Sequence, residues 1–325
     1  MDDSSRILNK TTTGTRPIVA NPIRRLHLDI RGAVQGVGFR PFLYRLASEL
    51  RLSGWVSNTS QGVIVEVEGP AAAVERFVQR VQDEKPVHSI IRHLEGNEIP
   101  AQGAAGFEIR ASLDGGVKSA LMLPDLGTCR ACLAEVFDLR NRRYLYPFTN
   151  CTHCGPRFSI IESLPYDRPN TSMKIFPMCP RCREEYENPR DRRFHAQPNA
   201  CPECGPRVEW RDAEGRALFT RHEALLAAAA AIREGRIVAV KGLGGFHLMA
   251  DARDAAAVAR LRERKHREEK PFALLFPSLA SLREECEVSD IEESLLLSPE
   301  SPIVLLRRKD WSHSANPVCR EAAPG

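Results

Sequence analysis

The sequence Cys129-Arg130-Ala131-Cys132, followed after eighteen residues by Cys151-Thr152-His153-Cys154, decides how this chain is organised. The same arrangement recurs 50 residues later, with Cys179 and Cys182 followed by Cys201 and Cys204. Eight of the ten cysteines therefore lie in four pairs at a fixed spacing. This repeat divides the chain into a part before the cysteines, the cysteine-rich part itself, and a part after it.

Paired thiolates at this spacing are typical ligands of zinc. Zinc binds four thiolates at about 2.3 Å, and two intervening residues let one tight turn present both sulfurs of a pair. We expect two structural zinc ions, each with four thiolates and no open position for catalysis. The expected ligands are Cys129, Cys132, Cys151 and Cys154 for one ion, and Cys179, Cys182, Cys201 and Cys204 for the other. An interleaved arrangement, in which the first pair shares an ion with the last, stays open.

Two other uses of the cysteines are weighed against zinc. Four disulfides would suit a secreted protein, but no apolar signal segment opens the sequence and intracellular thiols stay reduced. A thioredoxin-like redox role needs one Cys-x-x-Cys on a βα scaffold and not four in register. We therefore expect a cytoplasmic zinc protein.

Length and charge bound the remaining possibilities. The chain has 325 residues, and 46 basic against 42 acidic residues give a formal charge of +4. The length favours two or three domains. The nearly balanced charge gives no electrostatic argument for binding of nucleic acid. No apolar run of about 18 residues is present, so we expect no membrane span. We expect Arg142-Arg143 and Arg192-Arg193 to lie on a solvated face, because no aromatic residues alternate with them for base stacking.

The part before the cysteines has the pattern of a ferredoxin-like βαββαβ fold. Alternating apolar residues predict strands at 26–34, 54–56 and 63–68, and two more are expected at 88–94 and 107–110. Helices are expected at 41–50 and at about 71–81. A glycine-rich turn, Gln35-Gly36-Val37-Gly38-Phe39-Arg40, separates the first strand from the first helix.

This turn has the composition of an anion cradle. Its two glycines, Gly36 and Gly38, let consecutive backbone N–H groups point inward at a helix N-terminus, where a phosphate-sized anion is stabilised. Arg40 can add a bidentate positive charge at the start of the helix. We therefore expect phosphate binding by Gln35, Gly36, Val37, Gly38, Phe39 and Arg40. A tight turn without a ligand is the alternative.

The stretch Arg31-Gly32-x-Val34-Gln35-Gly36-Val37-Gly38-Phe39-Arg40, followed by Gly54-Trp55-Val56-x-Asn58, resembles the signature of acylphosphatases. In that family the arginine binds the phosphate and the asparagine orients the attacking water, which implies these catalytic roles for Arg40 and Asn58. An acyl phosphate is an activated anhydride, so positioning and charge stabilisation can suffice without a general base. An acylphosphatase-like fold without turnover stays open.

The part after the cysteines alternates helices with strands, as α/β domains do. We expect helices at 221–234 and 254–264 and strands at 236–240, 272–276 and 301–306. Lys265, Arg267 and Lys270 form a basic loop that can hold a triphosphate, although a solvated charge run is the alternative. The motif Lys265-x-Arg267-x-x-Lys270-Pro271 resembles the nucleotide-binding signature of YrdC-like domains, which bind ATP and form carbamoyl-adenylates.

The order of the three parts resembles that of HypF-type hydrogenase maturation carbamoyltransferases. The resemblance implies an α+β multidomain protein: an acylphosphatase-like domain (25–112), tandem zinc ribbons (118–209) and an incomplete YrdC-like domain (217–325). The polar composition of the residues before these domains predicts a disordered tail (1–24). It implies hydrolysis of carbamoyl phosphate in the first domain and carbamoyl-adenylate formation with ATP in the last. In that family a partner protein of hydrogenase maturation accepts the carbamoyl group on a cysteine, where it becomes the cyanide ligand of a nickel–iron centre.

The chain ends at Gly325, after about 105 residues of a domain expected to be nearly twice as long. We therefore expect an N-terminal fragment or truncated form, in which phosphate release survives but complete transfer does not. Two other function classes stay open. One is a zinc-ribbon RNA-binding or tRNA threonylcarbamoylation protein, because YrdC-like domains also serve that modification. The other is a plain acylphosphatase to which the ribbons add nothing.

Overall fold

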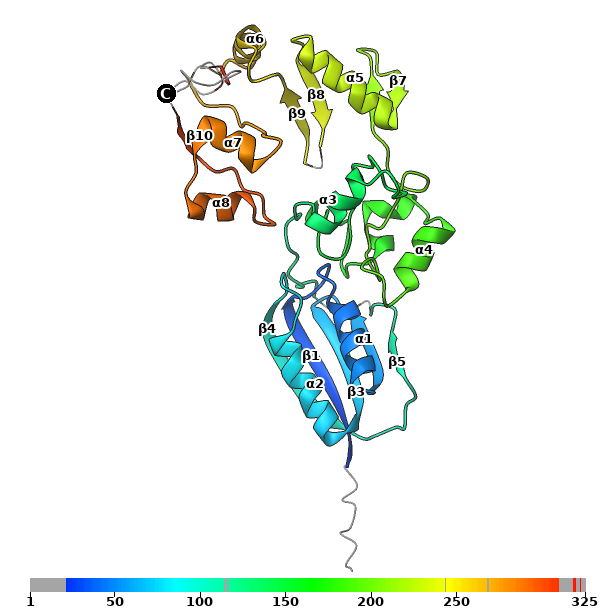
Figure 1. The fold of residues 1–325 in the computed structure, drawn as a ribbon. Helices are drawn as coiled ribbons and strands as arrows, with labels where there is room; N and C mark the ends of the chain where they lie inside the picture. Colours follow the sequence, from blue (N-terminus) through cyan, green and yellow to red (C-terminus); the bar gives the residue numbers. More distant parts are fainter. Residues whose placement is uncertain are drawn as a thin grey trace, which may run out of the picture.

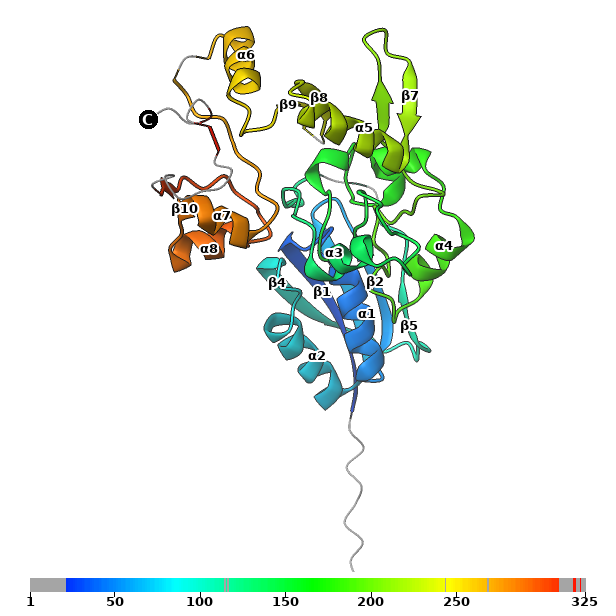
Figure 2. The same cartoon turned by 45° about the horizontal axis from the view of Figure 1, so that its top comes forward.

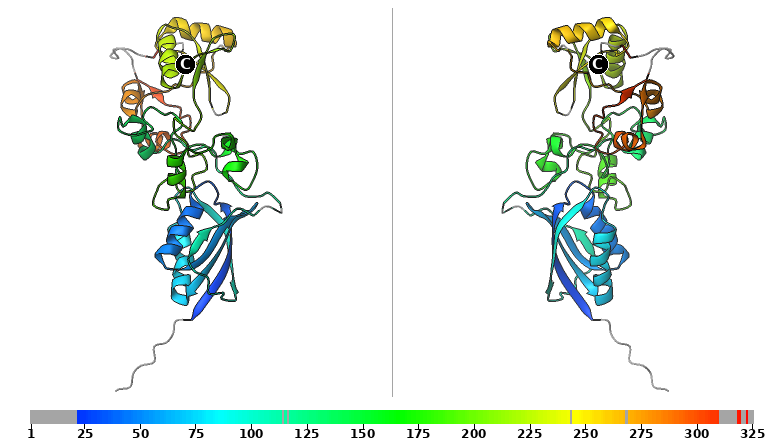
Figure 3. Two further views of the ribbon diagram at one scale, coloured as in Figure 1. Left: turned by 90° about the vertical axis from the view of Figure 1, so that its right-hand side faces the viewer. Right: turned by 90° about the vertical axis from the view of Figure 1, so that its left-hand side faces the viewer.

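Figure 1 shows the computed structural model of the chain, which describes residues 22–113, 115, 117–242, 244–267, 269–309, 318–319 and 322. The expected tail, 1–24, lies outside these residues except at its end, where the first strand already begins at Ile23. The cysteine-rich part lies between a five-stranded sheet at one end of the molecule and the C-terminal helices at the other (Figures 1 and 3). Within the described residues, no helix is long and apolar enough to span a membrane.

The sheet has the strand order β4-β1-β3-β2-β5. Its strands are β1 (Ile23–Ala33), β2 (Ser53–Asn58), β3 (Gly62–Pro70), β4 (Ile90–Ile99) and β5 (Phe107–Ile109). β5 runs parallel to β2, and the other neighbours are antiparallel. The predicted ferredoxin-like architecture is confirmed, and the strand predicted at 107–110 is β5, which forms one edge of the sheet.

Helices α1 (Phe39–Glu49) and α2 (Ala71–Asp83) cover one face of this sheet (Figures 1 and 3). Successive side chains of a strand point to opposite faces, so Leu28 and Ile30 of β1 are buried under the helices. Phe39 of α1 and Phe77 of α2 are buried against them. Each such side chain contributes roughly 1.5–3 kcal/mol to folding, and the resulting core fixes where α1 begins.

The cysteine-rich part contains two short helices at equivalent places in the repeat, α3 (Arg130–Phe137) and α4 (Pro180–Glu187). Cys129 and Cys179 are their N-cap residues. Between the two repeats lie three 3-10 turns, η1 (Phe158–Ile160), η2 (Arg168–Asn170) and η3 (Ser172–Ile175). This part of the chain lies over the end of the sheet at which α1 starts (Figure 2).

The C-terminal part begins with strands β6 (Glu209–Arg211) and β7 (Ala217–Thr220) and helix α5 (Arg221–Arg233). Strands β8 (Val238–Lys241) and β9 (Phe246–Met249) and helix α6 (Ala255–Lys265) follow. The last elements are α7 (Leu279–Glu285), β10 (Cys286–Glu287), α8 (Asp290–Leu296) and β11 (Arg307–Arg308).

Both helices expected in this part are present, but the strands expected at 272–276 and 301–306 are wrong, because these residues form no strand. A strand must share its backbone hydrogen bonds with a neighbour. In the described C-terminal residues the strands pair only two by two, as β6-β7, β8-β9 and β10-β11.

Candidate acyl phosphate site and zinc sites

The eight paired cysteines form two separate groups of four. The first contains Cys129, Cys132, Cys151 and Cys154, and the second contains Cys179, Cys182, Cys201 and Cys204. In each group the sulfur atoms lie within 4.8 Å of one another. The ribbons therefore use the local arrangement, and the interleaved alternative is excluded.

The sulfur spacing fits a tetrahedral zinc ion in each group. A tetrahedron with bonds of about 2.3 Å places its corners about 3.8 Å apart. The sulfur of Cys151 lies 3.8 Å from that of Cys129 and 4.0 Å from that of Cys154. In the second group, Cys201 lies 3.8 Å from Cys179 and 3.7 Å from Cys204. Four thiolates complete the coordination shell, so these sites stabilise the fold and leave no position for a substrate.

The arginines between the cysteine pairs cross from one ribbon to the other. Arg192, in the second repeat, donates to the sulfur of Cys132 in the first at 3.1 Å. Arg142, in the first repeat, donates to the sulfur of Cys182 in the second at 3.3 Å. The expectation of a solvated arginine face is wrong for Arg143 and Arg193, because both are buried. A buried guanidinium needs an anionic partner, and Glu185 and Glu135 supply it.

The glycine-rich turn has the backbone of an anion cradle. Gly36 and Gly38 adopt left-handed conformations with φ of 70° and 76°, which a residue with a Cβ rarely adopts. Gly38 is the N-cap of α1, so Arg40 lies in the first turn of that helix, and its side chain is buried. Gln35 ties the turn to the β2–β3 loop through hydrogen bonds to the carbonyl oxygens of Thr59 and Gly62.

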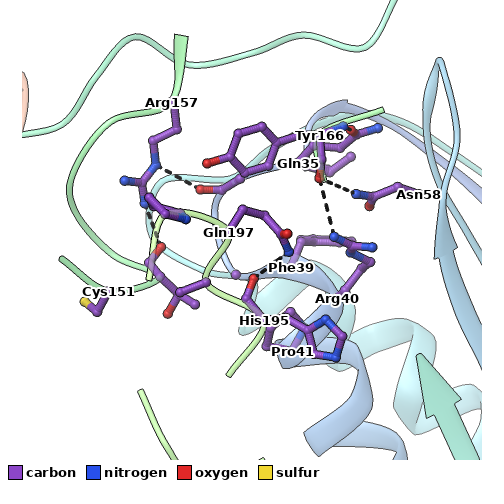
Figure 4. A pocket seen from close by; sticks show the side chains of 16 residues that line it. Gln35, Phe39, Arg40, Pro41, Asn58, Cys151, Arg157, Tyr166, His195 and Gln197 are labelled. Atoms are coloured by element: carbon purple, nitrogen blue, oxygen red, sulfur yellow. Dashed lines mark hydrogen bonds between the residues drawn. The ribbon is translucent and has the colours of Figure 1, made fainter. Parts of the chain in front are cut away.

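The two predicted catalytic side chains lie beside the turn and meet at one oxygen atom. Asn58, at the end of β2, donates from Nδ2 to the carbonyl oxygen of Tyr166 at 3.3 Å. Arg40 donates to the same oxygen at 3.5 Å (Figure 4). The backbone N–H of Tyr166 donates to Oε1 of Gln35 at 2.9 Å. The backbone of Tyr166, in the cysteine-rich part, is therefore hydrogen-bonded to Gln35 and Arg40 of the glycine-rich turn and to Asn58 beside it.

The carbonyl of Tyr166 also sets the orientation of the Asn58 amide. A carbonyl oxygen only accepts hydrogen bonds, so the NH₂ side of the amide must face it. The Oδ1 atom of Asn58 is buried and has no partner among the described residues. A buried acceptor without a partner is costly unless a water or ligand bonds to it. The amide thus offers an acceptor to a water molecule beside the cradle.

The cysteine-rich part covers the cradle and encloses a cavity of about 30 Å³. Arg157, Tyr166 and His195 line it together with Arg40 and Asn58 (Figure 4). A buried water needs about 10–15 Å³ by this measure, so the cavity has room for roughly two waters. No motif or spacing in the sequence indicates that Tyr166 or His195 belongs to the site. For Arg157 the sequence contains one signal: the residue recurs as Arg207, and in both repeats it follows Cys-Gly-Pro.

Arg40 forms an ion pair with a residue of the cover. Its guanidinium lies 2.6 Å from Oδ1 of Asp167. The hydroxyl of Ser112 donates to the other oxygen of the same carboxylate. Asp167 is not among the residues that line the cavity, whereas Arg40 is. The carboxylate therefore holds the guanidinium from outside the cavity wall.

Burial shifts the pKa of two groups in the cavity wall. Burial, with Arg40 nearby, lowers the pKa of His195 to about 4, so its imidazole is neutral at pH 7. Burial raises the pKa of Tyr166 to about 12, and its phenol stays protonated. Neither group carries charge at neutral pH, and the arginines dominate the electrostatics of the cavity.

Among the predicted nucleotide-binding residues, Lys265 is the last residue of α6, and Arg267 and Lys270 lie in the loop after it. The cysteine-rich part separates α6 from the sheet that carries the cradle (Figure 1). Lys265 and Lys270 are exposed. The Arg267 guanidinium donates to the carbonyl oxygens of Lys270 and Pro271 at 3.0 and 2.6 Å. The loop is thus closed on itself by Arg267, while both lysines face solvent.

Comparison with known families follows the same three parts. The acylphosphatase family matches residues 26–109, the HypF finger family matches 128–161 and 178–211, and the telomere recombination family, which includes YrdC, matches 230–324. An acylphosphatase of Moorella thermoacetica is 38% identical over 90 residues, which are 27% of this chain and 96% of the relative.

Longer matches extend over all three parts. Carbamoyltransferase HypF of Synechocystis sp. is 48% identical over 287 residues, which cover 88% of this chain and 37% of the relative. A crystal structure of full-length HypF in a phosphate- and nucleotide-bound form aligns with a TM-score of 0.85 at 43% identity, over 93% of this chain and 39% of that one. This chain thus spans little more than a third of the length of the HypF proteins that it matches. The same three parts in the same order, at this identity, show that the chain belongs to the HypF family.

Proposed function

We propose that residues 25–112, completed by the cover from the cysteine-rich part, hydrolyse an acyl phosphate, with carbamoyl phosphate as the substrate. The observation that carries the proposal is the convergence of Arg40 and Asn58 beside the glycine turn. The cradle and Arg40 bind the phosphoryl group, and the unpartnered Oδ1 of Asn58 accepts a hydrogen bond from the attacking water.

In this proposal the water attacks phosphorus, and the bond between phosphorus and the carbamoyl oxygen breaks. The products are carbamate and hydrogen phosphate, and one proton is released. Arg40 and the backbone N–H groups of the turn stabilise the charge that develops on the phosphoryl oxygens. With its pKa lowered to about 4, the His195 imidazole is a weak proton acceptor, and the phenol of Tyr166 stays protonated at pH 7. The proposal therefore assigns the role of general base to neither residue.

The wider role of the HypF family is part of the same proposal. Carbamate is short-lived in water, so an enclosed site favours its transfer to a second site. We assign ATP binding and carbamoyl-adenylate formation to the YrdC-like residues 217–325, with Lys265, Arg267 and Lys270 as the nucleotide loop. A partner protein of hydrogenase maturation then accepts the carbamoyl group on a cysteine. Thiolate ligands suit the reducing cytoplasm, where we place the protein.

An RNA-binding role is less well supported. An open basin between the ribbons is lined by seven arginines (Arg140, Arg142, Arg143, Arg181, Arg190, Arg192 and Arg193). Four of the seven are already paired with Glu135 or Glu185. Charges that are committed to internal partners contribute little to phosphate-backbone binding.

The test is to incubate the chain with carbamoyl phosphate and ATP and to measure phosphate and pyrophosphate separately. Phosphate release that Arg40→Ala abolishes supports the hydrolytic site. Pyrophosphate formation supports adenylation as well. Phosphate release undiminished by Arg40→Ala would refute the assignment of the site. Equal rates with acetyl and carbamoyl phosphate would indicate a plain acylphosphatase.

A further inference from the structure

A second buried arginine lines the phosphate cavity, and it comes from the first zinc ribbon. Arg157 follows the knuckle of Cys151 and Cys154 in the sequence, and it is fully buried. Its Nε donates to the carbonyl oxygen of Gly36, in the cradle, at 2.9 Å. Its two terminal nitrogens donate to the carbonyl oxygens of Gly155 and Thr152 at 2.7 and 2.8 Å.

The charge of Arg157 is not balanced by a carboxylate. The structure gives its guanidinium no ion pair with any described Asp or Glu. Asp125 is close, but it accepts the backbone N–H groups of Arg157 and Ser159 and not the side chain. Three of the five guanidinium N–H groups have carbonyl acceptors, and the other two have none among the described residues. A buried charge of this kind is costly unless an anion accompanies it.

The positive charge of Arg40, the other arginine of the cavity wall, is largely compensated by a carboxylate. Arg40 is paired with Asp167, so the two together are close to neutral. Without Arg157, a phosphate dianion in the cavity would meet backbone N–H groups and one compensated guanidinium. With Arg157 the cavity wall carries a net positive charge.

Arg157 also acts through the backbone of the cradle. The carbonyl of Gly36 and the N–H of Val37 belong to one peptide group, so a cation on the carbonyl makes that N–H a stronger donor. The hydrogen bond also fixes the plane of this peptide. We propose that Arg157 is a second phosphate-binding cation, which the zinc ribbon contributes to the acylphosphatase-like site. This inference rests on the phosphate site of the proposed function but is independent of turnover.

The test measures binding of inorganic phosphate to the zinc-loaded full chain by calorimetry, for wild type, Arg157→Met and Arg157→Lys. Methionine keeps most of the length of the side chain and removes the charge, whereas lysine keeps the charge and loses the fork. We expect Arg157→Met to weaken phosphate binding at least tenfold and Arg157→Lys to weaken it less than about threefold, each with two zinc ions still bound.

Arg168 provides a matched control. It is also bonded to three carbonyl oxygens of the cysteine-rich part, those of Gln197, Asn199 and Phe176, but it does not line the cavity. We expect Arg168→Met to bind phosphate within twofold of wild type. Wild-type affinity in Arg157→Met, or equal losses in Arg157→Met and Arg168→Met, would overturn the inference. Phosphate binding without hydrolysis of carbamoyl phosphate by the wild-type chain would instead overturn the proposed function and leave this inference standing.

Discussion

Arg192 donates a hydrogen bond to the sulfur of Cys132 at 3.1 Å, although the two residues belong to different zinc ribbons. The 50-residue repeat makes the relationship reciprocal, because Arg142 donates to Cys182. Hydrogen bonds to a thiolate stabilise its charged form and orient it on the metal. Each ribbon therefore depends on its neighbour for the outer shell of its metal site.

Arg192→Ala should weaken zinc binding at the first site about tenfold, the lower end of the effect expected for an outer-shell partner. Arg142→Ala should do the same at the second site. Zinc release to a chelator, with alkylation of Cys132 and Cys182 followed by mass spectrometry, identifies the site that empties first. Arg190→Ala is the control, because Arg190 is exposed and its side chain makes no bond to sulfur among the described residues. If Arg192→Ala exposed Cys182 first, the crossed arrangement would be wrong.

Glu185→Gln should destabilise the cysteine-rich part by about 3 kcal/mol, because it leaves Arg143 buried without its anion. Burial raises the pKa of Glu185, but hydrogen bonds from Arg143 and Arg142 outweigh it and bring the pKa down to about 2. The matched control in the same helix is Glu187→Gln. Within the part of the chain that the structure describes, the one ion pair of Glu187 is with Arg183 and is exposed, so this substitution is expected to change stability by less than about 0.5 kcal/mol. Chemical denaturation of the zinc-loaded protein compares them, and equal effects would contradict the prediction.

Asn58→Ala should lower kcat for carbamoyl phosphate about a hundredfold and change KM less than threefold, because it removes the acceptor for the attacking water and not the phosphate cradle. Steady-state phosphate release measures both constants. Asn150→Ala is a suitable control, since Asn150 is also a buried amide with an unpartnered Oδ1 but lies outside the cavity wall. A rise in KM at constant kcat would assign Asn58 to phosphate binding instead.

Tyr166→Ala should widen the range of acyl groups that the site accepts. A Cβ on Gly36 would lie 3.2 Å from the Tyr166 ring, so the ring packs directly on the cradle. Removing it enlarges a cavity of about 30 Å³. The ratio of benzoyl phosphate to carbamoyl phosphate hydrolysis should rise about tenfold. Tyr144→Ala, which truncates an exposed tyrosine, should leave the ratio unchanged, and an unchanged ratio in Tyr166→Ala would show that the ring does not limit substrate size.

His195→Asn should reduce the acid sensitivity of folding. The folded pKa of His195, about 4, lies below its ordinary value of 6.5. The unfolded chain therefore binds more protons between these values, and stability falls as the pH falls from 6.5 to 4. At pH 5 this costs about 2 kcal/mol. Asparagine tolerates the positive φ of 54° at this position. Denaturation at pH 7 and pH 5 should show a smaller difference for the variant than for wild type, and equal differences would mean that His195 is not responsible.

Some features followed from the sequence because their chemistry is local. Four thiolates at fixed spacing predict the zinc groups, and the glycine turn with Arg40 predicts the cradle, since each needs only neighbouring residues. Tyr166 and Asp167 lie more than 120 residues from Arg40, and no periodicity marks a contact between two parts of a chain. The residues 272–276 have the apolar and aromatic character of a buried strand, but strand formation depends on a partner that sequence pattern does not supply.

The Tyr166 segment has one more consequence. Its N–H donates to Gln35, and its carbonyl accepts hydrogen bonds from Asn58 and Arg40. The two sides of the cavity, the cradle and the cysteine-rich part, therefore come from segments that lie far apart in the sequence. Substitutions in the cysteine-rich part can alter which substrates fit the cavity, while the cradle keeps the residues proposed to bind the phosphoryl group. Selectivity and reactivity can therefore change at separate positions of the chain.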